Sequence, residues 1–137
     1  MKKVYICSPC RGDYEKNITK AQEYCREAAL AGVLPIAPHV YLTQFLADTV
    51  PAERELGLSL GLELLRGCDE VWVYGIAAPS AGMTAEIKLA QELGIPVVDG
   101  TDAEVKQGQY PGAGATRPNA GSDAWWLRAP TGGSYGG

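Results

Sequence analysis

Short apolar runs alternate with longer segments of helical periodicity along the first hundred residues of the chain. Runs rich in β-branched and aromatic residues predict strands at residues 3–7, 33–37, 70–74 and 95–98. Apolar residues at helical spacing predict helices at residues 14–31 and 83–93, which Gly32 and Gly94 end. Units of strand, helix and strand build parallel sheets, so this pattern indicates an α/β fold.

Residues 52–66 carry two competing patterns. Leucines alternate strictly with other residues, as is typical of a strand, at Leu56, Leu58, Leu60, Leu62 and Leu64. However, Pro51 can begin a helix, Glu53 suits a first turn, and the segment is long for a strand, so we predict a helix. This helix would be apolar on two sides, with a shallow groove at Gly57 and Gly61. One side can cover the sheet, and the other predicts a partner helix and therefore a homodimer.

The segment before this helix, residues 38–51, is predicted to be an irregular loop. It holds the polar or aromatic residues His39, Tyr41, Gln44 and Asp48. A long loop inside a compact domain is more often functional than not, so we expect this segment to serve a site.

Composition and charge narrow the class of protein. The chain has 137 residues, of which 46% are hydrophobic and 20% charged, and its net charge is −4. This balance argues against binding to a nucleic-acid polymer, because such proteins carry a basic face. No apolar run approaches the roughly 20 residues that span a bilayer, and the apolar stretch near the start is too short for a signal peptide. We therefore predict a cytoplasmic protein that does not enter a membrane.

The character of the sequence changes after Asp99. Residues 100–137 hold nine of the seventeen glycines and show little periodicity. This predicts one domain at residues 1–99 and a flexible C-terminal extension at residues 100–137. Trp125 and Trp126 are the exception, because adjacent tryptophans usually pack against something.

Cys7 and Cys10 form a CxxC motif at the end of the first predicted strand, where thiol–disulfide oxidoreductases carry theirs. In a reducing compartment the cysteines are otherwise expected to be free thiols or core residues. The sequence has no second CxxC motif, and His39 is its single histidine. A tetrahedral metal site would lack ligands, so we expect neither a metal nor another cofactor.

Glu86 is the acidic residue that the pattern places near a ligand crevice. Ligands of parallel α/β sheets bind at the carboxyl ends of the strands, and the turn at residues 79–82 leads from such an end into the last predicted helix. Glu86 would fall in the first turn of that helix, where the helix dipole favours an ionised carboxylate. Either this charged group faces a ligand, or it merely supports the start of the helix.

Four motifs, VYICSPCRG, PIAPHVY, CDEVWVY and SAGMTAEI, occur in this order within residues 1–98. Together they resemble the nucleoside 2-deoxyribosyltransferase-like family, and most closely its 2'-deoxynucleoside 5'-phosphate N-hydrolases. The resemblance implies a flavodoxin-like (Rossmann-like) parallel sheet of four to five strands flanked by helices. It also implies dimers that share active-site surface and a small-molecule substrate, a nucleotide or nucleoside.

The resemblance implies a role for individual residues in each motif. Glu86 matches the nucleophile that attacks the anomeric carbon and holds a covalent glycosyl intermediate, and Tyr5 matches the tyrosine that orients this carboxylate. The implied substrate-binding residues are Ser8, Pro9, Arg11, Gly12, His39, Ser80, Gly82 and Met83. Within this set, the first loop and Ser80 would bind phosphate, and Gly82 would let the sugar approach closely.

Gly61 departs from the pattern of the resembled family. Relatives carry an aspartate eight residues before the position of Asp69, where it protonates the leaving base, and this chain has Gly61 there. The candidate acids in its place are Asp48, Glu53, Glu63 or a residue of a partner chain.

Three functions are therefore open. The leading hypothesis is an N-glycosidase or deoxyribosyltransferase-like enzyme that acts on a nucleotide or nucleoside through Glu86. The second is a non-catalytic binder of a nucleotide or nucleotide-derived signal, a sensor or a sponge, for which a proton donor is unnecessary. The third is a thiol redox protein that uses Cys7 and Cys10.

Overall fold

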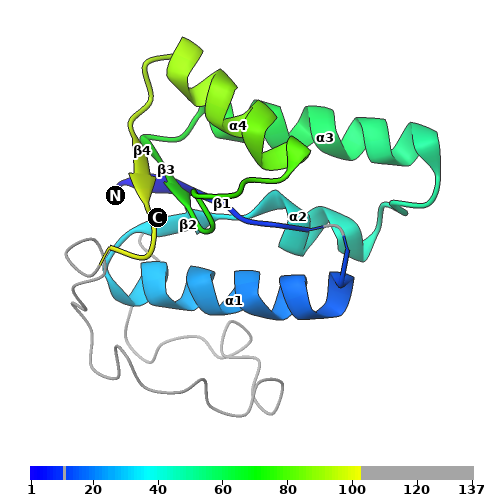
Figure 1. Cartoon of the computed structure of the whole chain (residues 1–137), viewed down its shortest axis with the longest axis horizontal. Helices are drawn as coiled ribbons and strands as arrows, with labels where there is room; N and C mark the ends of the chain where they lie inside the picture. Colours follow the sequence, from blue (N-terminus) through cyan, green and yellow to red (C-terminus); the bar gives the residue numbers. More distant parts are fainter. Residues whose placement is uncertain (11, 103–137) are drawn as a thin grey trace, which may run out of the picture.

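A computed structural model describes residues 1–10 and 12–102 of the chain, which form one parallel sheet covered by helices on both faces (Figure 1). The strands lie in the order β2-β1-β3-β4, and every neighbouring pair is parallel. Their bounds are β1 (Lys3–Cys7), β2 (Leu34–Ile36), β3 (Glu70–Val73) and β4 (Val97–Asp99). The predicted α/β fold is confirmed, with four strands. The predictions for Trp125, Trp126 and the rest of residues 103–137 lie outside the described residues.

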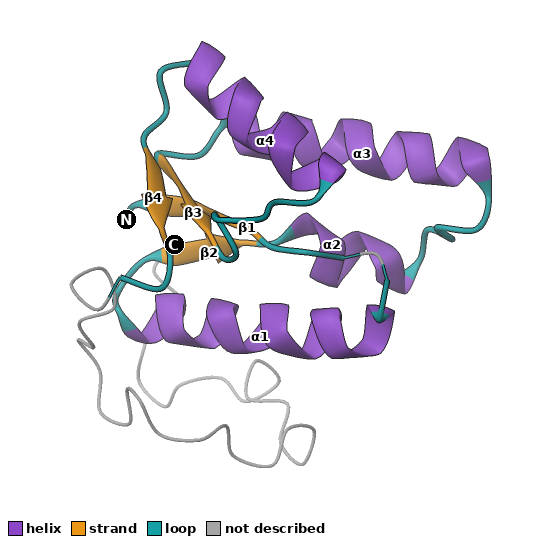
Figure 2. Cartoon of the chain, in the orientation of Figure 1, coloured by secondary structure: helices purple, strands orange, loops and turns teal. Residues whose placement is uncertain are grey.

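The helices form two layers around the sheet, with α1 on one face and α3 and α4 on the other (Figure 2). Their bounds are α1 (Tyr14–Leu30), α2 (Pro38–Tyr41), α3 (Pro51–Arg66) and α4 (Ala81–Glu92), with a 3₁₀ turn η1 (Leu42–Gln44) directly after α2. Within the described residues, no helix is long and apolar enough to cross a membrane.

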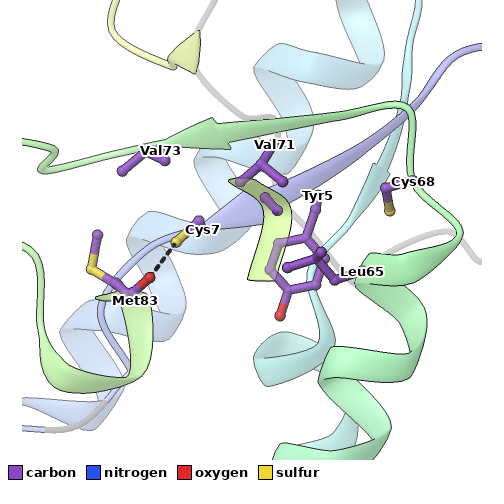
Figure 3. Packing of buried hydrophobic residues seen from close by; sticks show 8 residues of the cluster. Tyr5, Cys7, Leu65, Cys68, Val71, Val73 and Met83 are labelled. Carbon is purple, nitrogen blue, oxygen red and sulfur yellow. Dashed lines mark hydrogen bonds between the residues drawn. The ribbon is translucent and has the colours of Figure 1, made fainter. Parts of the chain in front are cut away.

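The alternation of side chains along β1 divides the core into two parts. Val4 and Ile6 pack with Ala28 of α1, whereas Tyr5 and Cys7 point to the opposite face. There they join a cluster that α3 and α4 complete, with Leu65, Cys68, Val71, Val73, Met83 and Ala90 (Figure 3). A strand buried on both faces explains why β1 is apolar at nearly every position.

The helix predicted at residues 52–66 is confirmed, despite its alternating leucines. Pro51 is the first residue of α3, where its missing N–H costs no hydrogen bond. Leu65 is fully buried against the sheet, while Leu56, Leu60 and Leu64 remain exposed. The helix is therefore apolar on two sides, as its sequence predicts.

Two local predictions are wrong. Residues 38–51 are not wholly irregular, because Pro38 begins α2 and the chain continues directly into η1. The last helix starts earlier than predicted, at Ala81, because the Ser80 hydroxyl accepts a hydrogen bond from the Met83 N–H at 3.3 Å. Glu86 is consequently the sixth residue of α4 and lies beyond the first turn, where the dipole acts most strongly.

Candidate active site

A cavity of about 640 Å³ opens beside the carboxyl end of β1. It lies between the loop after β1, the segment α2–η1, the cavity-facing side of α3 and the first half of α4. The predicted site residues that line it are Tyr5, Ser8, His39, Ser80, Gly82, Met83 and Glu86. Segments far apart in the sequence thus meet at one site, at the edge of the sheet where parallel α/β proteins bind ligands.

Tyr5 and Glu86 form the polar centre of this cavity. Tyr5 is only 3% exposed, and its hydroxyl interacts with the Glu86 carboxyl group. Burial raises the pKa of Glu86 to about 7, although the interaction with the Tyr5 hydroxyl acts in the opposite direction. Burial and the neighbouring Glu86 also raise the pKa of Tyr5, which therefore keeps its proton. The sequence predicts that the helix dipole favours the ionised form of Glu86, whereas burial acts in the opposite direction and raises its pKa.

Ser8 and His39 form a second polar pair in the cavity. Ser8 Oγ lies 3.0 Å from His39 Nε2, so the first loop and α2 are joined at this point. Burial lowers the pKa of His39 to about 4, which makes the imidazole neutral at physiological pH. The pair can thus orient a ligand by hydrogen bonds, without adding a charge.

Gly61 of α3 is buried and faces this polar centre. A Cβ atom at this position would lie 3.6 Å from the Tyr5 hydroxyl oxygen and 3.7 Å from Pro38 Cβ, both ordinary contacts. Gly57, one turn earlier on α3, lines the same cavity, so the groove predicted at these two glycines is present. On the side of α3, the wall of the cavity next to Tyr5 therefore consists of helix backbone without a side chain.

The acids predicted as substitutes for an aspartate at position 61 do not all face the cavity. Asp48 and Glu53 line it, whereas Glu63 is exposed and pairs with Arg66 at 3.9 Å. Asp48 lies 3.5 Å from the guanidinium of Arg54, and Glu53 Oε1 accepts the Ala47 N–H at 3.0 Å.

Other predicted residues lie beside the cavity or contribute differently. Pro9 and Gly12 are outside the lining, and Arg11 is outside the described residues. Met83 belongs to the core, where its carbonyl oxygen lies 3.9 Å from the Cys7 thiol. A Cβ on Gly82 would meet no atom within 4 Å, so packing within the protein does not require glycine there.

Sequence reasoning missed the apolar wall of the cavity, which Leu42, Leu46, Leu58 and Leu62 form. Each pair is four residues apart, so a helical reading of both segments would have placed each pair on one face. The segment of the first pair was predicted to be an irregular loop. For Leu58 and Leu62, the helix was predicted, but not which of its two apolar sides faces a ligand.

The CxxC motif lacks the environment of a redox centre. Cys7 is completely buried, and burial together with the nearby Glu86 raises the pKa of its thiol. Reactive cysteines instead have a lowered pKa and solvent access. Cys7 is thus a core residue, and the redox hypothesis gains no support.

Residues 2–99 match the family described as Domain of unknown function (DUF7768). The chain belongs to this family. Members of the DUF7768 family are thereby expected to share the sheet and helices that hold Tyr5, Gly61 and Glu86. No curated protein matches the sequence.

Two solved structures are similar to this DUF7768 protein in fold. A 2-deoxyribosyltransferase from Bacillus psychrosaccharolyticus has a TM-score of 0.50 at 20% identity, covering 69% of each chain. A 2-deoxyribosyltransferase from Leishmania mexicana has a TM-score of 0.53 at 18% identity, covering 72% of this chain and 63% of its own. At such identity the likeness concerns the fold, and it agrees with the deoxyribosyltransferase-like sheet that the motifs imply. The closer resemblance to the N-hydrolases stays a prediction.

Proposed function

We propose that this protein cleaves or transfers the N-glycosidic bond of a nucleoside or nucleotide, with Glu86 as the nucleophile. The observation that carries the proposal is the placement of Glu86 beside the buried Tyr5 in the lining of a cavity of about 640 Å³. Such a volume is typical of small-molecule sites. The similar fold of two 2-deoxyribosyltransferases supports chemistry of this general kind.

The proposed reaction begins with the ionised Glu86 carboxylate. One carboxylate oxygen attacks the anomeric carbon of the sugar while the base departs, which gives a covalent glycosyl ester. Tyr5 keeps the carboxylate in a fixed orientation, because its raised pKa leaves the hydroxyl protonated and able to donate a hydrogen bond. Water or a second base then attacks the same carbon and releases Glu86.

Ser8, His39 and Ser80 are the proposed ligand-binding groups. Ser8 and His39 offer a neutral hydroxyl–imidazole pair, and Ser80 precedes α4, where backbone N–H groups favour an anion. A phosphate at this end of the cavity would fit these donors. Arg11 is proposed as its cationic partner on the basis of the sequence motif alone.

The direct test is Glu86→Gln, which keeps the shape and removes the nucleophilic carboxylate. Release of free base from a panel of nucleosides and nucleotides should fall at least about a thousandfold, or about 4 kcal/mol in the barrier. Glu92→Gln, an exposed change at the end of the same helix, is the matched control. Base release that persists in Glu86→Gln at the parent rate would reject the proposal.

A second candidate is a non-catalytic nucleotide binder, a sensor or a sponge. It is favoured by the raised pKa of Glu86, about 7, because much of the carboxyl is then protonated at neutral pH. Mass spectrometry of protein incubated with the same panel separates the two functions. Intact nucleotide retained without free base would indicate the binder.

A further inference from the structure

Gly61 lies beside the hydroxyl of Tyr5, close to the proposed nucleophile Glu86. A Cβ on Gly61 would lie 3.6 Å from the Tyr5 hydroxyl, which acts on the pKa of the Glu86 carboxyl group. A sugar attacked by Glu86 would therefore have its departing base near this part of α3. Gly61 offers only backbone there, and the backbone carries no acidic proton.

The titratable side chains described near Gly61 are poor candidates for the proton donor. Burial and the neighbouring Glu86 raise the pKa of Tyr5, which makes its hydroxyl a weak acid, and Glu86 is the proposed nucleophile. His39 is neutral well above pH 4 and is paired with Ser8, so it is a poor proton donor. None of these groups is available to protonate a leaving base.

The remaining acids of the described lining, Asp48 and Glu53, lie toward the other end of α3. Glu53, Gly57 and Gly61 follow one another at four-residue steps on the cavity side. Eight residues of helix place Glu53 about 12 Å from Gly61 along the axis. A general acid must come within about 3 Å of the atom that it protonates, so Glu53 is too distant. Asp48 is held at the same end by Arg54, at 3.5 Å.

The lining of the cavity is apolar on one side and carries carboxyl groups. Leu42, Leu46, Leu58 and Leu62 offer an apolar surface that suits a flat ring. Near Gly61 the carboxyl group of the described lining is that of Glu86, since Asp48 and Glu53 lie toward the other end of α3 and Asp48 pairs with Arg54. A flat ring with a positive charge would match both properties.

We propose that the substrate is an N-glycoside whose base carries a fixed positive charge, such as a pyridinium nucleotide or a 7-alkylated purine nucleotide. This inference rests on the proposed function of Glu86. A Glu86 oxygen forms the bond to the anomeric carbon, the C–N bond breaks, and its electron pair neutralises the ring nitrogen. The base departs as a neutral molecule without any proton. Water then attacks the same carbon, the ester bond to Glu86 breaks, and the proton of that water passes to solvent.

Matched pairs of substrates test this charge requirement with the full chain. Nicotinamide mononucleotide is compared with its reduced form, and 7-methylguanosine 5′-monophosphate with guanosine 5′-monophosphate, the guanine pair in both ribose and deoxyribose forms. Free base is measured by chromatography, and the rate with Glu86→Gln protein is subtracted as the blank. Because general-acid help is worth about 10² to 10⁴ in rate, we expect the charged member of a pair to be cleaved at least about a hundredfold faster.

Each result separates the inference from the proposed function. Glu86-dependent cleavage of the neutral members at the rate of the charged ones overturns the inference and leaves the proposed function standing. In that case Cys10→Ser would show whether the thiol of Cys10, which also lines the cavity, supplies the proton. Absence of Glu86-dependent cleavage for every compound overturns both.

Gly61→Asp provides an independent arm, with Gly61→Asn as its matched control. The Cβ has room, and only the aspartate can carry a proton to the leaving base. Cleavage of guanosine 5′-monophosphate or its deoxy form should be at least tenfold faster in Gly61→Asp than in Gly61→Asn, and the ratio of the charged to the neutral rate within the guanine pair should fall. The inference fails if both variants fold, cleave the charged substrates and cleave the neutral substrates at the rate of the parent. In that case the lack of a proton donor does not limit the rate of the parent.

Discussion

Tyr5 on β1 and Glu86 on α4 meet in the cavity, where the Tyr5 hydroxyl opposes the effect of burial on the carboxyl group. Burial raises the pKa of Glu86, the Tyr5 hydroxyl lowers it, and the result is about 7. The carboxyl thus changes charge within the physiological range. This balance makes both the proposed activity and the stability of the fold depend on pH.

Tyr5→Phe removes the group that lowers the pKa of Glu86. The pKa should then move above 7, and base release should begin to rise only at higher pH than in the parent, since the nucleophile must be ionised. At pH 7 the rate should fall about 10- to 100-fold, and by less at pH 9. The measurement is kcat/KM against pH, with Tyr24→Phe, on the other face of the sheet, as the control. An unshifted midpoint would show that Tyr5 does not control the ionisation of Glu86.

Glu86→Gln should stabilise the protein, but only where Glu86 would be ionised. The folded pKa of about 7 exceeds the ordinary value of 4.5, so the folded state binds more protons between these values and loses stability as pH rises through them. The full cost is about 3 kcal/mol above pH 7, at 1.4 kcal/mol per pKa unit. Urea unfolding at pH 4 and pH 8 should show a gain for Glu86→Gln that grows with pH. A gain of the same size at both values would contradict this account, and Glu92→Gln should show none.

The strands and long helices were predictable because their signals are local. The apolar run of β1 ends at Cys7 as predicted, and Pro51 identifies the start of α3 in spite of its alternating leucines. The meeting of Tyr5, His39 and Glu86 at one cavity followed from the motifs and the parallel topology. These features need only the sequence pattern and the rule that strand ends share an edge.

The electrostatic state of the site could not be predicted in the same way. The sequence indicates a helix near Glu86, and hence a dipole that favours its ionised form. The burial that raises the pKa of Glu86 comes from distant segments. Likewise, Leu46 and Leu58 become one apolar wall only because the segment after α2 folds against α3. Such properties belong to tertiary packing, which no single segment encodes.

His39→Gln should change the pH dependence of stability in the opposite sense to Glu86→Gln. The folded pKa of His39, about 4, lies below the ordinary 6.5, so the parent loses stability as pH falls through this window. The loss amounts to about 3 kcal/mol below pH 4. Relative to the parent, His39→Gln should therefore gain stability as pH falls from 6.5 to 4, measured by urea unfolding. A difference that does not vary with pH would mean that His39 is protonated as easily in the folded chain as in the unfolded one.

The exposed leucines of α3 predict that two copies of the chain associate. Leu56, Leu60 and Leu64 recur at four-residue steps and are 49%, 38% and 42% exposed, so they form one apolar stripe along the helix. Burying one leucine contributes about 1.5 kcal/mol or more, and a symmetric interface contains each change twice. Leu60→Lys should therefore weaken a dimer about a hundredfold or more.

Sedimentation velocity from 1 to 100 µM measures this association. The parent should sediment as a dimer, and Leu60→Lys should sediment as a monomer with unchanged circular dichroism. Thr19→Lys, an exposed change on α1 at the opposite face of the sheet, should remain dimeric. If the parent is monomeric throughout this range, the stripe does not join two copies of the chain. If Leu60→Lys and Thr19→Lys dissociate alike, the contact lies elsewhere, because only Leu60 belongs to the stripe.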